Sequence, residues 1–501
     1  MSLLKKLAGQ TAIYGLSSMV GRLLNYFLVP LYTHVMDPAT YGVSSWFYAF
    51  ASFAAVIFTY GMETAFFRFS SSNTSDSSKT EEDNRTFATI FISILVSSIG
   101  FSLLIFLFSS QLSHATGNDG RAEFFKYFAL ILGADAITAI PFARLRQQGK
   151  PTRFAMLRLL SIGINICLNL WWYLIEKRTD IAPMFWANIL SSVLILPFFY
   201  QDFKNIRYGF DAQLWKKMFF YAFPLIFMGF AGMINETLDR MLLKMLIPDQ
   251  LIAETQTGIY NANYKLSLLV TLFIQAFRMG AEPFFFARAK SNGAAETYAK
   301  VMRIFVAVCA LLFVMVMVYL DFFKFFIGKK YWSGLKVVPI LLMANICLGM
   351  YYNLSIWYKL TDKTRLGAWV SVAGAGVTLF FNWLWIPTLG YLGSAWATLI
   401  CYAFMAVTSW FLGQRFYPVP YPIGRIFGYL ALALGVWQVF EWLKNALFVN
   451  EIATKNINLP PSGGLRGDIL GGGLFALSTA CFLLFAGILW LMEKNTIRNA
   501  N

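Results

Sequence analysis

The sequence is poor in charged residues and has almost no histidine. Only 13% of the 501 residues are Asp, Glu, Lys or Arg, and only two are histidine. A soluble globular chain carries about 25% charged residues. No phosphate-binding loop of the Gly-x-x-x-x-Gly-Lys-Ser/Thr type is present, which argues against an appended ATPase. The polar gaps are too short to form a soluble catalytic domain.

Residue groups that would build a catalytic or metal site are also lacking. His34 and His114 both fall in expected outer loops, and no His/Cys cluster has metal-ligand spacing. No Gly-x-Ser-x-Gly nucleophile motif occurs. The five cysteines lie within expected helices, where they serve as small apolar residues. We therefore expect a protein that is not an enzyme and holds no metal or other cofactor.

Long apolar runs fill the chain instead. Hydrophobic residues make up 58% of it and aromatic residues 18%. A spanning helix needs about 20 mostly apolar residues, and lipid leaves unpaired backbone groups no partner. An all-α integral membrane protein with about fourteen transmembrane helices is therefore expected. The expected spans are approximately residues 11–32, 42–65, 87–109, 124–142, 154–175, 183–201, 218–246, 258–281, 301–320, 337–358, 367–386, 391–413, 425–448 and 469–492.

The net charge of +16 fits this class of protein. Cytoplasmic loops of membrane proteins carry an excess of Lys and Arg. When both termini are placed in the cytoplasm, most of the Lys and Arg fall in cytoplasmic segments. The basic loop 144–153 is one of them. The charge therefore predicts an orientation, and no nucleic-acid partner is expected.

An internal repeat divides the chain. Tyr41 precedes Glu63 at the same spacing as Tyr260 precedes Glu282, and each pair brackets the second helix of its half. Further matches in the same order join residues 150–153 to 363–365 and residues 186–187 to 396–397. Each half then holds six helices, so the two halves enter the membrane with the same orientation.

The repeat predicts two parallel six-helix lobes around a central cavity. The N-lobe is expected at residues 1–210 with helices one to six, and the C-lobe at 211–415 with helices seven to twelve. Two tail helices follow at 416–501. Rocking of such lobes gives alternating access to a central site.

Basic residues inside the expected spans are candidates for binding an anionic solute. An ionisable group in a spanning helix costs roughly 2.5–3.5 kcal/mol, so it is a functional candidate by default. Several Arg or Lys donors can replace the water around a diphosphate. The expected substrate-binding residues are Arg22, Arg240, Lys265 and Arg278.

Acidic residues at similar depth are candidates for ion coupling or gating. Glu236 and Arg240 are four residues apart and can pair on one helix face. A structural ion pair is the alternative for each such residue, and Lys244 is expected to reach outward to the surface. The ion-coupling or gating candidates are Asp135, Glu63, Glu236, Asp239 and Glu282.

Several stretches resemble a known family. They are Val29-Pro30-Leu31-Tyr32 through Pro38-Ala39-Thr40-Tyr41-Gly42, Gly61-Met62-Glu63-Thr64-Ala65-Phe66-Phe67-Arg68, Gly149-Lys150-Pro151-Thr152-Arg153 and Gly390-Tyr391-Leu392-Gly393-Ser394-Ala395-Trp396-Ala397. They resemble bacterial polysaccharide transporters, the Wzx-type flippases of lipid-linked oligosaccharides. Their superfamily also holds the lipid II flippase and the multidrug/toxin exporters.

The resemblance implies translocation of an undecaprenyl-diphosphate-linked oligosaccharide from the cytoplasmic to the periplasmic leaflet of a bacterial inner membrane. It implies coupling to Na⁺, H⁺ or the membrane potential. The expected partners are this lipid-linked substrate, membrane lipids, a polysaccharide polymerase and a chain-length regulator. Related flippases hold the diphosphate on basic residues of helices one and eight, which correspond here to Arg22 and to Lys265 or Arg278.

Three alternatives stay open. A cation-coupled multidrug exporter on the same scaffold would favour acidic groups in the cavity. Here, basic groups outnumber acidic ones within the spans. A membrane glycan polymerase or glycosyltransferase could recruit the aspartates of the outer loops. The third alternative is an assembly factor that binds glycosyltransferases without transporting anything.

Overall fold

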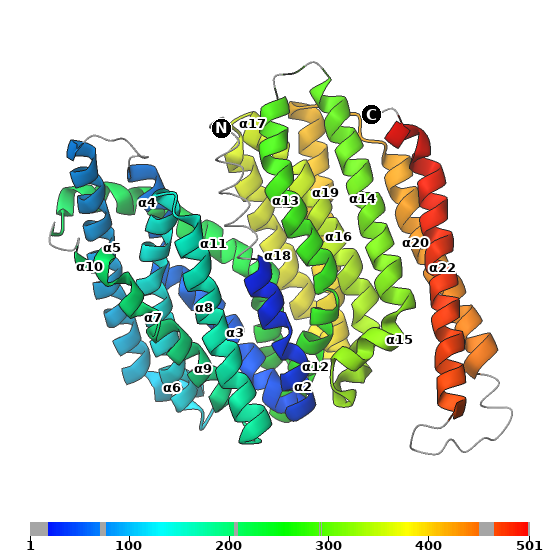
Figure 1. Ribbon diagram of the computed structural model, residues 1–501, viewed down its shortest axis with the longest axis horizontal. Helices are drawn as coiled ribbons and strands as arrows, with labels where there is room; N and C mark the ends of the chain where they lie inside the picture. Colours follow the sequence, from blue (N-terminus) through cyan, green and yellow to red (C-terminus); the bar gives the residue numbers. More distant parts are fainter. Residues whose placement is uncertain are drawn as a thin grey trace. The chain divides into compact units, whose positions relative to one another are not determined.

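The computed structural model describes residues 19–70, 77–204, 209–289, 291, 293–449 and 465–498. All regular structure within these ranges is helical (Figure 1). Thirteen of the described helical segments are long and apolar enough to cross a membrane. The chain is therefore a multi-pass membrane protein, as its composition predicts.

The helices are bounded as follows: α2 (Leu28–Val35), α3 (Pro38–Thr59), α4 (Met62–Phe69), α5 (Ser77–Leu107), α6 (Ser109–Ala115), α7 (Ala122–Gln147), α8 (Pro151–Leu170), η1 (Trp171–Ile175), α9 (Ala182–Val193), η2 (Leu196–Phe199), α10 (Tyr200–Phe203), α11 (Ala212–Leu246), α12 (Gln250–Leu266), α13 (Leu268–Arg288), α14 (Ala294–Val318), α15 (Leu320–Phe323), η4 (Lys324–Phe326), η5 (Lys329–Val337), α16 (Val338–Leu354), α17 (Ile356–Leu360), α18 (Thr364–Leu389), α19 (Tyr391–Phe416), α20 (Ile423–Lys444), η6 (Asn445–Val449) and α22 (Leu465–Arg498).

The expected spans coincide with described helical segments, several of which are interrupted within the span. The span expected at 11–32 begins outside the described residues. Its described part is helical over residues 19–26 and in α2, with a break at Phe27. The span expected at 258–281 consists of two helices, α12 and α13, which meet at Ser267.

Local sequence explains where α3 begins and ends. Asp37 precedes the helix and accepts a hydrogen bond from the Thr40 backbone N–H at 3.0 Å, with a proline at the first helical position. Such a cap satisfies a backbone donor that the helix itself leaves unpaired. The helix ends at Tyr60 and Gly61, both with positive φ angles. This turn places Glu63 in the first turn of α4.

The chain divides into two compact units. Unit 1 comprises Met1–Lys265 and Ser371–Ala397, and unit 2 comprises Leu266–Val370 and Thr398–Asn501. Unit 1 therefore includes α11 and α12 together with the helices of the expected N-lobe. The lobe boundaries at residues 210 and 415, read from the repeat, stay a prediction.

Aromatic rings form the core of unit 1. The ring centroids of Phe47 and Phe128 are 5.6 Å apart, and those of Phe128 and Phe185 are 4.8 Å apart. All three side chains are fully buried, and they come from α3, α7 and α9. Such clusters combine large apolar burial with favourable ring geometry, and they hold these helices together.

Helices α3 and α12 approach each other closely through a pair of glycines. A Cβ atom added at Gly42 would lie 1.8 Å from the backbone oxygen of Glu254. One added at Gly258 would lie 1.9 Å from the backbone oxygen of Pro38. Only glycine fits at either position, because its lack of a side chain lets two helix backbones approach closely.

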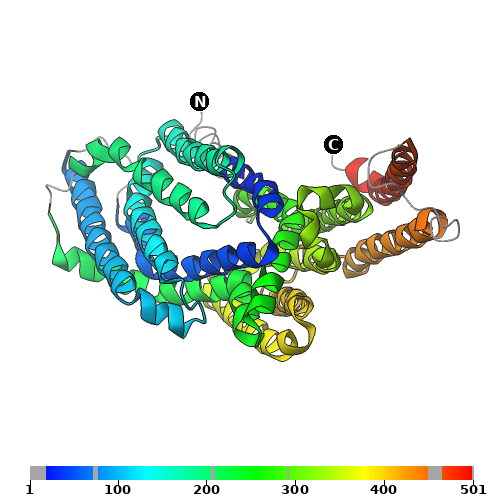
Figure 2. The same cartoon turned by 90° about the horizontal axis from the view of Figure 1, so that it is seen from below.

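In unit 2, α14 packs against α16, α20 and α22. Helices α20 and α22 lie beside each other in both views (Figures 1 and 2). Ser478 of α22 donates a hydrogen bond to the backbone oxygen of Val318 at 2.7 Å. Glu493 of α22 forms a buried ion pair with Arg303 of α14 at 3.2 Å and accepts a hydrogen bond from Tyr429 of α20. The tail helices are therefore fixed to α14 by polar contacts at two levels.

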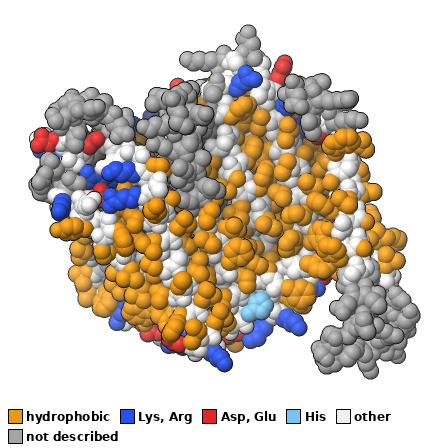
Figure 3. Space-filling view, in the orientation of Figure 1, with side chains coloured by type: hydrophobic (Ala, Val, Ile, Leu, Met, Phe, Trp, Pro, Cys, Tyr) orange, Lys and Arg blue, Asp and Glu red, His pale blue; other side chains and the backbone are white. Residues whose placement is uncertain are grey.

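Hydrophobic side chains cover most of the visible helical surface (Figure 3). Lys, Arg, Asp and Glu side chains gather near the helix ends on that face (Figure 3). Many large apolar side chains are exposed, among them Phe220 on α11 and Trp383 on α18. Such exposure is what a lipid-facing surface requires, because the surrounding acyl chains are themselves apolar.

Candidate functional site

Helix α11 brings a buried ion pair to its contact with α12. The guanidinium of Arg240 lies 3.0 Å from the Asp239 carboxylate, and only 8% and 6% of these two side chains are exposed. Tyr260 of α12 donates a hydrogen bond to the other Asp239 oxygen at 2.7 Å. The pair has further partners, as buried charges require.

The partners of Arg240 extend the cluster to α3. Its Nε donates to the Asn261 side-chain oxygen at 3.2 Å, and Asn261 in turn donates to Ser45 of α3 at 2.8 Å. The guanidinium also lies 4.5 Å from the centre of the Tyr264 ring. In this conformation Arg240 is therefore held on all sides by protein groups.

The expected side-chain pair between Glu236 and Arg240 is not formed. Arg240 donates to the backbone oxygen of Glu236 at 2.7 Å, and its ion-pair partner is Asp239. The Glu236 side chain is exposed. Asp239 is buried beside Arg240 and provides the counter-charge that a buried guanidinium requires.

Lys265 is the basic residue that this cluster leaves accessible. It lies near the end of α12 and is partly exposed. Its ammonium interacts electrostatically with Arg240 and with Glu236. It has no hydrogen-bond or ion-pair partner among the described residues. Asp239 already balances the charge of Arg240, and Glu236 makes no hydrogen bond to Lys265, so the ammonium can still donate to an added anion.

The other two predicted cations lie elsewhere. Arg22 is exposed on the helical residues 19–26 and has no ion-pair partner in the described part of unit 1. Arg278 is exposed on α13 of unit 2, where its guanidinium lies 4.6 Å from the centre of the Tyr352 ring. The structure therefore brings together Arg240 and Lys265 of the four. A single pocket shared by all four stays a prediction.

Asp135 lies midway along α7 and faces polar groups of neighbouring helices. Ser192 of α9 donates a hydrogen bond to its carboxylate at 2.5 Å, and the charge of Arg158 on α8 is close enough to interact with it. Nearby, Asn188 of α9 donates to the Tyr48 hydroxyl of α3 at 2.5 Å. A carboxylate with hydroxyl and amide neighbours can hold a proton or a small cation.

Glu63, one of the five candidates for ion coupling or gating, forms an ion pair. Its carboxylate accepts a hydrogen bond from Arg146, near the end of α7. Arg68, which follows Glu63 in the sequence, lies instead 4.3 Å from the centre of the Tyr221 ring. The side chain of Glu282, the matching acid of the repeat, lies outside the described part of the structure.

A second buried ion cluster was not anticipated from the sequence. Lys244 lies 3.0 Å from the Glu254 carboxylate, with 3% and 5% of the two side chains exposed. Arg121 donates to the other Glu254 oxygen at 3.0 Å, and Lys244 also donates to Asn118. The expectation that Lys244 reaches outward is therefore wrong, because Glu254 provides a buried counter-charge.

The ion cluster determines the charge of Glu254, which lies on α12 before the expected span. Burial alone would raise the pKa of this carboxyl. The hydrogen bond from Arg121 and the charge of Lys244 outweigh burial and lower its pKa below the ordinary value. Glu254 is therefore a carboxylate at neutral pH and links α7, α11 and α12.

No group of His, Cys, Asp and Glu side chains with the geometry of a metal site occurs among the described residues. The candidate sites are instead made of single carboxylates and cations on packed helices. This arrangement offers charged and polar groups to a solute of opposite charge.

Solved structures of membrane transporters have the same fold. The lipid II flippase MurJ, in an inward closed conformation, has a TM-score of 0.69 and 14% identity, and the match covers 97% of this chain and 99% of that one. An inward-facing MATE-family multidrug resistance transporter of the MOP superfamily has a TM-score of 0.62 and 13% identity, covering 82% and 95%. A MOP superfamily transporter from Pyrococcus furiosus has a TM-score of 0.58 and 13% identity, covering 81% and 95%.

The sequence identifies the family. Residues 7–287, more than half of the chain, match the family described as polysaccharide biosynthesis protein. The chain belongs to this family. Among curated proteins compared by sequence, none matches it.

Proposed function

We propose that the protein is a flippase that moves an undecaprenyl-diphosphate-linked oligosaccharide from the cytoplasmic to the periplasmic leaflet by alternating access. The family and the MOP-type transporter fold support transport in polysaccharide biosynthesis. The observation that carries the substrate proposal is Lys265, a partly exposed ammonium beside Arg240 with no hydrogen-bond partner among the described residues. A diphosphate provides the charge that this position favours.

The proposed substrate-binding cations differ in exposure. Arg22 of unit 1 and Arg278 of unit 2 are exposed and Lys265 is partly exposed, whereas Arg240 is buried and paired with Asp239. Asp135 is the proposed ion-coupling carboxylate, with Na⁺ or H⁺ as the coupling ion or the membrane potential as the driving force. Glu63, Glu236 and Glu282 are proposed to act in gating.

The proposed setting follows from the same function. The protein lies in a bacterial inner membrane with both termini in the cytoplasm, which the distribution of Lys and Arg supports. Besides membrane lipids and the lipid-linked substrate, a polysaccharide polymerase and a chain-length regulator are the proposed partners. No catalytic step is assigned to the chain.

The test is complementation of a strain that lacks the gene. Lys265→Ala should abolish surface glycan and cause the lipid-linked precursor to accumulate, while the protein stays in the membrane at its normal level. Lys265→Arg, which keeps the charge, should restore display. Arg178→Ala is the matched control, because Arg178 is an exposed external cation paired with Asp180. Normal display with Lys265→Ala would contradict the diphosphate site.

A multidrug exporter is the second candidate, since MATE transporters share the fold. Exposed Glu236 is an acidic group that a cationic drug could use. Drug susceptibility of the deletion strain separates the two functions. Increased susceptibility that Glu236→Gln fails to complement, with surface glycan unaffected, would favour the exporter.

A further inference from the structure

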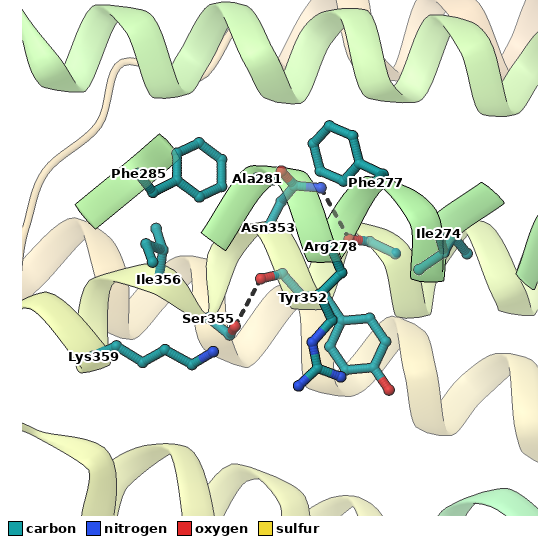
Figure 4. Close-up of a pocket in the computed structure, with 11 residues that line it drawn as sticks. Ile274, Phe277, Arg278, Ala281, Phe285, Tyr352, Asn353, Ser355, Ile356 and Lys359 are labelled. Carbon is teal, nitrogen blue, oxygen red and sulfur yellow. Dashed lines mark hydrogen bonds between the residues drawn. The ribbon is translucent and has the colours of Figure 1, made fainter. Parts of the chain in front are cut away.

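The cavity between α13 and the α16–α17 segment of unit 2 is small and closely packed (Figure 4). The guanidinium of Arg278 lies 4.6 Å from the centre of the Tyr352 ring. The Ser355 hydroxyl donates to the backbone oxygen of Tyr352 at 2.7 Å. These groups already have protein partners, and the space between them is too small for a lipid headgroup. Cations with more room around them lie on the surface of the same unit.

The segment that joins α14 to α16 is rich in lysine. After Asp321, the next acidic residue in the sequence is Asp362. The lysines of the segment are Lys324, Lys329, Lys330 and Lys336. The segment lies between two spans, at helix ends predicted to be external, where Figure 1 labels α15. External loops of membrane proteins are usually poor in Lys and Arg, so this positive charge calls for a specific explanation.

Helix η5 of this segment separates its residues onto distinct faces. It is a 3₁₀ helix of nine residues, and with three residues per turn, side chains three positions apart line up. The buried face consists of Tyr331, Gly334 and Val337. The adjacent face is exposed and consists of Lys330, Ser333 and Lys336. The register of η5 therefore presents two lysines together, away from the core, with exposed Lys329 at its start.

Two aromatic side chains lie in the same segment. The Trp332 indole N–H donates to the backbone oxygen of Lys324 at 2.9 Å, and the ring centres of Trp332 and Phe325 are 5.4 Å apart. Phe325 is 59% exposed. Exposed aromatic rings beside lysines are typical of the membrane–water interface, where the rings contact acyl chains just below the headgroups. This composition places the lysines of η5 beside lipid headgroups.

The acidic residue in contact with this segment is already paired. The Asp321 carboxylate lies 2.6 Å from the ammonium of Lys324 and 3.1 Å from that of Lys444. Lys329 and Lys330 have no hydrogen-bond or ion-pair partner among the residues that the structure describes. The exposed side of η5 therefore keeps a positive charge that an anion can neutralise.

We propose that the exposed lysines of η5 bind the headgroup phosphates of anionic phospholipids in the leaflet that these helix ends face. Lys329, Lys330 and Lys336 donate to the phosphates, while Phe325 and Trp332 contact the acyl chains. An ammonium is a strongly hydrated point charge that suits exchangeable contacts on an open surface, whereas planar guanidinium groups suit a fixed, bidentate phosphate. Binding of this kind anchors the end of unit 2 at the bilayer surface, whatever solute the protein transports.

Photocrosslinking of the purified full-length protein in nanodiscs tests this surface. The probe is phosphatidylglycerol with a diazirine near its headgroup, present at increasing fractions in phosphatidylcholine, and mass spectrometry identifies the labelled peptides. Each lysine near an anionic surface contributes about fivefold to binding. In the double variant Lys329→Gln/Lys330→Gln, the probe fraction for half-maximal labelling of residues 322–337 should rise about 25-fold. Lys329→Arg/Lys330→Arg keeps both charges and should be labelled like the native protein.

Lys177→Gln/Arg178→Gln is the matched control. These adjacent cations are exposed and also lie in a loop predicted to be external, but Arg178 is paired with Asp180 at 2.8 Å. The control removes the same net charge and should leave labelling of residues 322–337 unchanged. Unchanged labelling in Lys329→Gln/Lys330→Gln would overturn the proposal, as would equal loss of labelling in the control.

Two further probes identify the ligand. A phosphatidylethanolamine with the same diazirine has no net charge and should label this segment weakly, so labelling equal to that by phosphatidylglycerol would overturn an anionic-lipid site. Unlabelled phosphatidylglycerol and an unlabelled prenyl diphosphate are then compared as competitors. Displacement by prenyl diphosphate at a much lower fraction would also overturn the proposal, because it would assign the lysines to a transported lipid. Higher salt should reduce labelling, since the contacts are exposed.

Discussion

The Nζ atom of Lys244 lies 3.0 Å from a carboxylate oxygen of Glu254, and both side chains are buried. With Arg121 and Asn118, the pair joins α11 and α12 to the start of α7. All these residues lie near the helix ends predicted to be external.

The first prediction concerns stability. Glu254→Gln removes the carboxylate that neutralises Lys244 and Arg121, and it leaves buried cations without a counter-charge. Breaking a buried pair in this way costs roughly 3–5 kcal/mol. The melting temperature of the purified protein in detergent should fall clearly. Asp180→Asn, in the half-exposed pair with Arg178, is the control and should change little. Equal melting temperatures of Glu254→Gln and Asp180→Asn would contradict a stabilising role for the buried ion cluster.

The second prediction concerns pH. The pKa of Glu254 is lowered in the folded protein, because Arg121 and Lys244 outweigh the effect of burial. A glutamate in an unfolded chain has a pKa of about 4.3. The stabilisation is therefore complete above that pH and is lost as the pH falls through the folded-state pKa. Melting of the native protein should be more sensitive to acidification below about pH 5 than melting of Glu254→Gln. The same pH dependence of melting in both proteins would show that Glu254 is not the source of the acid sensitivity.

The third prediction concerns the close approach of α3 and α12. An added methyl group at Gly42 or Gly258 would lie within 2 Å of a backbone oxygen of the facing helix, so the helices must separate. Gly42→Ala should lower the free energy of unfolding by about 1–3 kcal/mol, the usual cost of overpacking. Gly376→Ala on α18 is the control, since nothing lies within 4 Å of its added Cβ. Equal stability of the two variants would show that the contact is not maintained in the membrane.

The fourth prediction concerns ion coupling. Asp135→Asn removes the charge but keeps the size and the contact with Ser192. Lipid translocation in proteoliposomes should then lose its dependence on the driving ion gradient. Ser192→Ala keeps the carboxylate, so it should retain the dependence with a reduced rate. If translocation by Asp135→Asn still depends on the ion gradient, Asp135 is not the coupling residue.

The helical fold class can be predicted from the sequence because each apolar run is long and continuous. Helix type follows from stretches such as 294–318, a mostly apolar run of 25 residues that forms one helix. No proline lies at the break between α12 and α13 at Ser267. Ser267 is instead buried and accepts a hydrogen bond from Asn345, a tertiary contact that no local pattern records.

The partners of the buried polar groups were predicted less well, because they come from distant positions in the chain. Charges inside spans can be recognised one by one, which is why the sequence singles out Arg240, Asp239 and Asp135; their functional roles stay predictions. Their partners cannot be recognised in this way. Arg121 and Glu254 are separated by 133 positions, and Arg146 and Glu63 by 83. Spacing along one helix suggested Glu236 for Arg240, whereas burial selected Asp239.

Glu493 stands near the end of the last helix, yet it is the buried counter-charge of Arg303 in α14. During synthesis Arg303 is inserted long before Glu493 has been translated. A nascent chain must therefore tolerate an uncompensated arginine until its final turns emerge. Products that lack α22 never acquire that carboxylate, so Arg303 stays without this counter-charge in them.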